Sequence, residues 1–104
     1  MQIDLSTYRA RIDSIDDIIL ELLNRRLKYA LEINQIKLEH GQQVMDPDRE
    51  KKIIERLRGY NEGPLSGEGM VLIFNTIIAE SRRLMAQARH GQEDSDAAPA
   101  AGPV

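Results

Sequence analysis

The stretch "LLNRRLKYALEINQIK", Leu22–Lys37, has a regular helical pattern whose apolar face is interrupted by a cation. Apolar residues recur at alternating steps of three and four, the spacing of a helix face that packs on another helix. The full face is Ile12, Ile15, Ile19, Leu22, Arg26, Tyr29, Ile33 and Ile36. Arg26 stands at its centre, where an unpaired cation is costly to bury. The pattern predicts a packed helix and raises the question of what Arg26 binds.

The chain is expected to be all-α, with three helices. Glycine and proline interrupt the sequence at few places, and the segments between them have helical rather than strand periodicity. The first helix begins near Ser6, an acceptable N-cap, and meets no helix breaker before Gly41. At 1.5 Å per residue its roughly 34 residues span about 50 Å, more than the diameter of a small domain.

Two shorter helices are expected to follow. The second begins after Asp46, a capping residue, has Pro47 at its first position and ends near Tyr60. The third covers residues 70–89. Its inward face is Phe74, Ile77, Ile78, Ser81, Leu84 and Met85.

The charge balance differs between the expected domain and the end of the chain. The 104 residues include 14 Lys and Arg against 17 Asp and Glu. Glu93, Asp94 and Asp96 lie in the last segment, 91–104, which has few bulky apolar residues, so we expect a disordered tail there. The expected domain, residues 1–90, is then evenly charged, which does not favour binding of nucleic acid.

The sequence has no features of a disulfide-bonded, metal-binding, secreted or membrane-spanning protein. Cysteine is absent, which excludes disulfides, and His40 and His90 match no metal-ligand spacing. The N-terminus "MQIDLSTYRA" has no signal pattern, and no apolar run approaches the ~18 residues of a membrane span. We therefore expect a cytoplasmic protein with no metal and no membrane partner.

The length of the first helix indicates self-association. Two shorter helices cannot cover the apolar face of so long a helix, and an intertwined homodimer is the simplest way to cover the rest. The alternative is a kinked first helix that closes a monomeric three-helix bundle.

Cations on the first helix form a candidate binding site. Arg26, Ala30, Ile33 and Lys37 share one helix face, with the two cations about 16 Å apart along the axis, so inward-leaning side chains could hold a small dianion. Alternatively, Arg26 forms an interhelical ion pair or sets register, and Lys37 is solvated. Arg9 lies about 25 Å along the axis from Arg26 and on another face, so it joins the site only from an antiparallel partner, or is a surface arginine.

The second and third helices add polar groups. Asp46, Arg49, Glu50 and Ile53 share a face, which places two carboxylates and a guanidinium beside an apolar wall; the alternative is a helix cap with exposed charges. Ser81 would face the same interior, or bond back to its own helix. Since no phosphate loop or nucleophile motif is present, any chemistry must use positioning and charge.

Four fragments, in order and at family-like spacing, resemble the all-α chorismate mutases. They are "YRARIDSIDDIILELLNRR", "LEINQIK", "DPDRE" and "IIAES", and the resemblance covers Leu5 to Met85. It implies an intertwined helical homodimer that rearranges chorismate, a small dicarboxylate, to prephenate on the route to phenylalanine and tyrosine. It implies no cofactor and no covalent intermediate.

The resemblance also implies a role for each charged residue. Arg26 and Arg49 bind carboxylates, and Arg9 reaches in from the other protomer. Lys37 meets a carboxylate and the ether oxygen whose bond breaks. These roles agree with the planar fork of arginine, which suits carboxylates, and with donors aimed at charge that grows on the ether oxygen.

The remaining implied roles concern the ring of the substrate. Asp46 and Glu50 take the ring-hydroxyl side, and Ser81 touches the ring carboxylate. The apolar wall is Ala30, Ile33, Ile53 and Ile78.

Met85 departs from the family pattern. Four residues after the last-helix serine the family commonly has Gln or Glu, which bonds the ether oxygen beside the lysine. Gln87 is no ready substitute, since two residues turn the helix by about 200°. A lost transition-state donor typically costs on the order of 3 kcal/mol, or 10²-fold in rate. Three interpretations stay open: a slow enzyme, a third helix shifted from this register, or a compensating donor.

Two other functions fit parts of the pattern. An isochorismate pyruvate lyase has a similar fold and shares the arginine and lysine positions, although the cluster Asp46, Arg49 and Glu50 looks more mutase-like. A non-catalytic helical dimer that binds a pathway metabolite or a partner enzyme would account for Met85.

Overall fold

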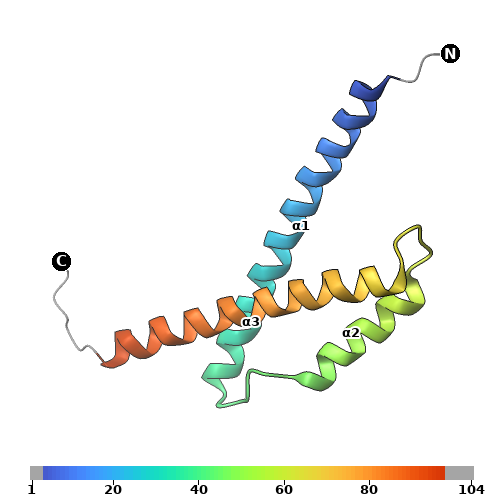
Figure 1. The fold of residues 1–104 in the computed structure, drawn as a ribbon. Helices are drawn as coiled ribbons and strands as arrows, with labels where there is room; N and C mark the ends of the chain where they lie inside the picture. The colour runs from blue at the N-terminus through green and yellow to red at the C-terminus, as the bar shows by residue number, and fades with distance from the viewer. Residues whose placement is uncertain (1–3, 98–104) are drawn as a thin grey trace, which may run out of the picture.

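The structure is a computed structural model that describes residues 4–97, of which 90–97 are described by their backbone alone. It consists of α1 (Leu5–Glu39), α2 (Pro47–Tyr60) and α3 (Gly67–Ala97), with no strand in the described range (Figure 1). The predicted all-α class and the three helices are confirmed.

The first helix is continuous from end to end. Its N-cap is Asp4 and not Ser6 as predicted, because the Asp4 carboxylate accepts the Ser6 N–H at 3.0 Å and also the hydroxyl of Thr7. It ends at Glu39, before Gly41, which has a positive φ of 65°. The kinked helix of the alternative monomeric bundle is not what the chain forms.

The second helix agrees with the sequence, and the third begins earlier than predicted. Asp46 accepts the Arg49 N–H at 3.0 Å, with Pro47 in the first turn. The third helix begins at Gly67 and not at Met70, because the Ser66 hydroxyl accepts the Gly69 N–H at 2.9 Å and so caps a glycine-rich first turn.

The end of the third helix also differs from the sequence prediction. Its backbone continues through Gly91 to Ala97, within the segment 91–104 that was expected to be disordered. A glycine lowers helix propensity by only about 1 kcal/mol, so one such residue does not have to end a helix. The rest of that segment, 98–104, lies outside the described residues.

Both other helices pack against α3. The first helix crosses α3 with its C-terminal half, while α2 lies along the N-terminal half of α3 (Figure 1). The buried apolar residues Ile53, Met70 and Ile78 lie on α2 and α3. Buried polar residues are Asn34 and Ser81, one on each of the two helices that cross.

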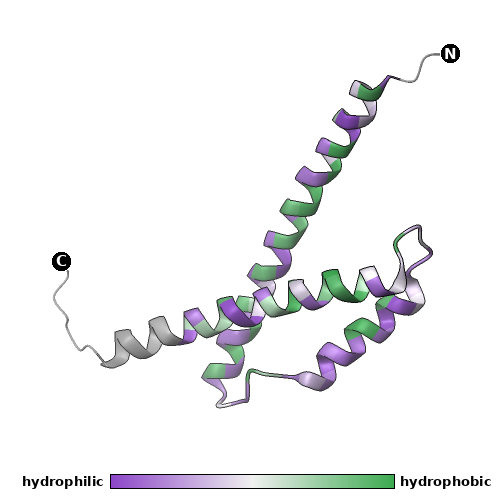
Figure 2. Ribbon diagram, in the orientation of Figure 1, coloured by the Kyte–Doolittle hydropathy of each residue, from purple (hydrophilic) through white to green (hydrophobic). Residues whose placement is uncertain are grey.

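The N-terminal half of α1 has no cover within the chain. Every residue from Asp4 to Leu22 is exposed, and Ile12, Ile15 and Ile19 retain 55%, 54% and 48% of their accessible surface. Figure 2 shows apolar residues recurring along the whole of this rod. The radius of gyration, 19.2 Å, exceeds the about 13 Å of a compact domain of this length. A single chain therefore leaves the predicted apolar face open.

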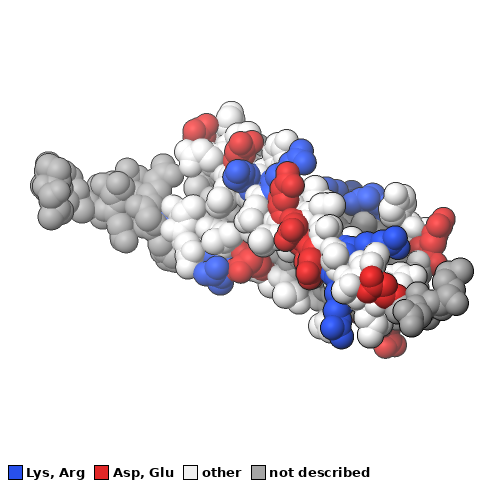
Figure 3. Space-filling view, turned by 90° about the horizontal axis from the view of Figure 1, so that it is seen from above, with Lys and Arg blue, Asp and Glu red and all other residues white. Residues whose placement is uncertain are grey.

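The described surface carries mixed charge. Figure 3 shows acidic and basic side chains on the same face of the molecule. Among the described helices, none combines the length and apolarity needed to cross a lipid bilayer.

Candidate active site

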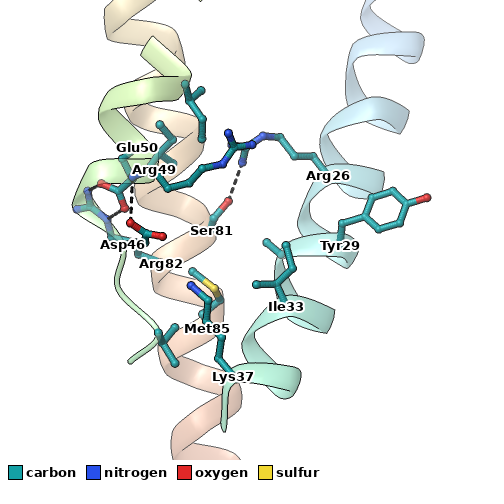
Figure 4. A pocket seen from close by; sticks show the side chains of 14 residues that line it. Arg26, Tyr29, Ile33, Lys37, Asp46, Arg49, Glu50, Ser81, Arg82 and Met85 are labelled. Carbon is teal, nitrogen blue, oxygen red and sulfur yellow. Dashed lines mark hydrogen bonds and ion pairs between the residues drawn. The ribbon is translucent and has the colours of Figure 1, made fainter. Parts of the chain in front are cut away.

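A cleft of about 280 Å³ lies where the C-terminal half of α1, the start of α2 and the middle of α3 meet (Figure 4). All three helices and the α1–α2 connection contribute to its lining. The residues are Arg26, Tyr29, Ala30, Ile33, Lys37, Val44, Asp46, Arg49, Glu50, Ile53, Ile78, Ser81, Arg82 and Met85. The structure thus brings together every residue that the sequence placed in the site, with the exception of Arg9.

Arg26 extends from α1 across the cleft to α3. Its Nη1 donates a hydrogen bond to the Ser81 hydroxyl at 3.1 Å (Figure 4). The Ser81 hydroxyl in turn donates to the Ile77 carbonyl at 3.2 Å, so the serine both bonds back to its own helix and faces the interior. Because Ser81 is buried and Arg26 is partly buried, this contact fixes the guanidinium at the cleft.

Arg26 and Arg49 bring two positive charges together. Figure 4 shows their side chains, from α1 and α2, pointing toward one another across the cleft. The pKa of Arg26 is lowered from its ordinary value, first by burial and second by the charge of Arg49. Within the part of the chain that the structure describes, no ion pair joins either guanidinium to a carboxylate. The arrangement suits an anion that comes from outside the chain.

The two carboxylates of the cleft are engaged on the α2 side. Asp46 caps α2 through the Arg49 backbone N–H, as one reading of "DPDRE" predicted. Glu50 accepts two hydrogen bonds from the Arg82 guanidinium on α3, of which the bond from Nε to Oε2 measures 2.8 Å. This hydrogen bonding raises the pKa of Arg82. Glu50 therefore lines the cleft but is paired with a cation of its own.

Lys37 and Met85 lie toward the same end of the cleft (Figure 4). Met85 and Ser81 lie one turn apart on α3 and both line the cleft, which gives the alternative of a shifted third helix no support. Its thioether is only a weak acceptor and donates no hydrogen bond. Gln87 is exposed and is not part of the lining.

Arg9 is not part of the cleft in its own chain. It is exposed and lies on the uncovered N-terminal half of α1, about 25 Å along the helix axis from Arg26. Any contact with this cleft has to come from a second copy.

Sequence reasoning missed three residues of the lining. Tyr29 was assigned to the packing stripe, although its position three residues after Arg26 was a usable signal. Val44 belongs to an irregular connection, where periodicity gives no information. Arg82 lies about 100° around α3 from Ser81, and only its partner on another helix brings it to the cleft.

The fold and the cleft define an all-α protein in which cations from two helices converge beside an apolar wall. Residues 8–86 match the family model described as chorismate mutase type II. The chain belongs to this family.

Relatives and solved structures agree with that assignment. The chain is 33% identical over 84 residues to the chorismate mutase of Methanocaldococcus jannaschii, covering 80% of this chain and 85% of the relative. It is 36% identical over 76 residues, 73% of this chain, to the bifunctional chorismate mutase/prephenate dehydratase of Neisseria gonorrhoeae, of which it spans only 20%. The form II chorismate mutase structure from Thermus thermophilus superposes with a TM-score of 0.77 at 29% identity, over 79% of this chain and 93% of that one.

The electrostatics of Arg26 give a prediction for stability. We expect Arg26→Met to raise the free energy of unfolding of the ligand-free protein by at most about 1 kcal/mol, because the substitution removes a charge that faces another cation but solvent still screens much of that repulsion. Urea denaturation at one fixed protein concentration measures this change. Arg25→Met, at the exposed neighbouring position, is the control and should change the value by less than about 0.5 kcal/mol. A loss of stability for Arg26→Met would mean that the hydrogen bond to Ser81 outweighs the electrostatic cost.

Proposed function

We propose that this chain catalyses the unimolecular rearrangement of chorismate to prephenate. The observation that carries the proposal is the facing pair Arg26 and Arg49, which has no carboxylate partner among the described residues and lies in a cleft walled by apolar side chains. A small dicarboxylate would supply the missing negative charge, and membership of the chorismate mutase type II family supports chorismate as that dicarboxylate.

The reaction needs a held conformation more than a reactive group. The ether C–O bond breaks while a C–C bond forms between the enolpyruvyl arm and the ring, so the arm must be folded over the ring. Arginine forks orient the carboxylates, and the apolar wall keeps the reactant compact. The proposed wall is Ala30, Ile33, Ile53 and Ile78.

Lys37 is the proposed donor to the breaking bond. Negative charge grows on the ether oxygen as the bond lengthens, and a fixed ammonium group stabilises that charge more than it stabilises the reactant. The proposal assigns Lys37 this role because it lines the cleft on the same helix face as Arg26.

The ring of the substrate is proposed to face α2 and α3. Asp46 and Glu50 accept from its hydroxyl group, and Ser81 contacts the ring carboxylate. The pairing of Glu50 with Arg82 does not prevent this, because each carboxylate oxygen has a second lone pair.

The working unit is proposed to be a homodimer. A second copy would cover the open apolar face of α1, and Arg9 of the partner subunit would supply a third guanidinium to the substrate. The support is the exposure of Ile12, Ile15 and Ile19 together with the distance of Arg9 from the cleft of its own chain.

A direct assay tests the function. Purified protein incubated with chorismate should form prephenate, and Arg26→Met should lower kcat/KM by at least about 10²-fold because it removes a carboxylate contact; Arg25→Met should not. Release of pyruvate from isochorismate would instead support the lyase. Binding of chorismate with no conversion at any protein concentration would support a non-catalytic dimer. Either result would contradict the proposal.

Met85 generates a second prediction. Met85→Gln places a donor beside Lys37 and should raise kcat on the order of 10²-fold, measured as initial rates at saturating chorismate. Met85→Leu, which fills similar space and donates nothing, should show no such rise. If Met85→Gln has the turnover of the parent protein, another donor already serves the ether oxygen.

Mixing of variants tests the shared site. Arg9→Ala and Arg26→Ala chains should each be inactive alone. After equal amounts are unfolded and refolded together, one intact site per mixed dimer should restore about a quarter of the parent activity. Each variant refolded alone is the control. No recovery from the mixture would show that Arg9 and Arg26 do not serve one site from different chains.

A further inference from the structure

The Arg82–Glu50 pair joins two helices at the edge of the cleft. Arg82 lies on α3 and Glu50 on α2, and the guanidinium meets the carboxylate at two points. The Glu50 side chain is 21% exposed and the Arg82 side chain 44%, so the carboxylate is better shielded from solvent than its partner. The Arg83–Glu80 pair, by comparison, lies within one helix and away from the cleft lining.

The position of this pair matters because of the cations nearby. Glu50 follows Arg49 directly on α2, and both side chains line the cleft together with Arg26. A glutamate without a partner would be attracted to those two guanidinium groups, since opposite charges attract strongly where solvent is partly excluded. It would then occupy the place of a ligand carboxylate.

Asp46 does not present the same competition. Its carboxylate is held by the Arg49 backbone N–H at the first turn of α2. Of the two carboxylates in the lining, Glu50 has the longer side chain, and Arg82 is the group that holds it. Figure 4 shows Glu50 and Arg82 on the α2 side, while Arg26 and Arg49 meet between α1 and α2.

We infer that Arg82 is a positioning residue that keeps the Glu50 carboxylate away from Arg26 and Arg49, so that the guanidinium pair stays free for the dianionic ligand. This inference rests on the proposed function. Arg82 acts through Glu50: it keeps one protein anion out of the ligand site and leaves one face of that carboxylate open to a ligand hydroxyl.

The inference predicts a suppressor relationship. Arg82→Gln should weaken binding of the oxabicyclic dicarboxylate mimic of the transition state about tenfold, which corresponds to 1.4 kcal/mol, and should raise KM more than it lowers kcat. Adding Glu50→Gln should recover most of the affinity, because an amide has no charge with which to neutralise the arginines. Titration calorimetry measures the mimic, and initial rates give kcat and KM.

Two further variants complete the design. Arg83→Gln removes the neighbouring ion pair and should leave affinity unchanged. Arg82→Lys keeps a cation but loses two-point pairing, so it should weaken binding about threefold, again with recovery when Glu50→Gln is added. Circular dichroism shows whether Arg82→Gln folds. If it does not fold, Arg82→Lys measured with and without Glu50→Gln still shows whether removing the Glu50 charge restores affinity.

The outcomes separate this inference from the proposed function. Parent affinity in Arg82→Gln, or a double variant that binds no better than Arg82→Gln alone, overturns the role of Arg82 while turnover of chorismate by the parent protein stands. A parent protein that binds the mimic but converts no chorismate overturns the function and leaves the suppressor test decisive for Arg82. A parent protein that neither binds nor converts overturns both.

Discussion

The repulsion between Arg26 and Arg49 is the constraint on which the rest of the site depends. Two guanidinium groups from different helices face one another in a partly desolvated cleft, an arrangement that costs free energy in the empty protein. Binding of a doubly negative ligand between the two guanidinium groups would make the same arrangement favourable. The bond from Arg26 to Ser81 holds one of these cations. The inferred role of the Glu50–Arg82 pair is to engage an anion that would otherwise compete for them.

The same helix that carries Arg26 also connects the site to association. Its C-terminal half packs on α3 and carries Arg26 and Lys37, while its N-terminal half is exposed throughout, has an open apolar stripe and carries Arg9. Covering that rod with a second copy would bury apolar surface and complete the charge of the cleft in one step. In this proposal, folding of the chain, pairing of two chains and construction of the site are one event.

Sequence periodicity predicted the features that depend on helix geometry. Arg26, Lys37, Asp46, Arg49, Glu50 and Ser81 were each placed by counting along a helix, and the cleft contains all of them. Capping was less predictable. Asp4 replaced Ser6 because both residues are able to cap and only the local hydrogen bonds decide. The third helix starts earlier than expected because Ser66 caps a first turn that contains two glycines. The pairing of Arg82 with Glu50 depends on how α2 and α3 pack, which single-helix counting does not contain. The role of Arg9 stays a prediction, because it depends on how a second chain packs against the first, which single-helix counting does not contain either.

A crystal structure of the protein with the oxabicyclic dicarboxylate mimic bound is the most direct test of the central claim. We expect the carboxylates of the mimic to contact the guanidinium groups of Arg26 and Arg49, with Arg9 of the partner subunit closing the site and Glu50 still paired with Arg82. A mimic bound elsewhere, or a protein carboxylate placed between Arg26 and Arg49, would contradict the claim that this cation pair is held open for the substrate.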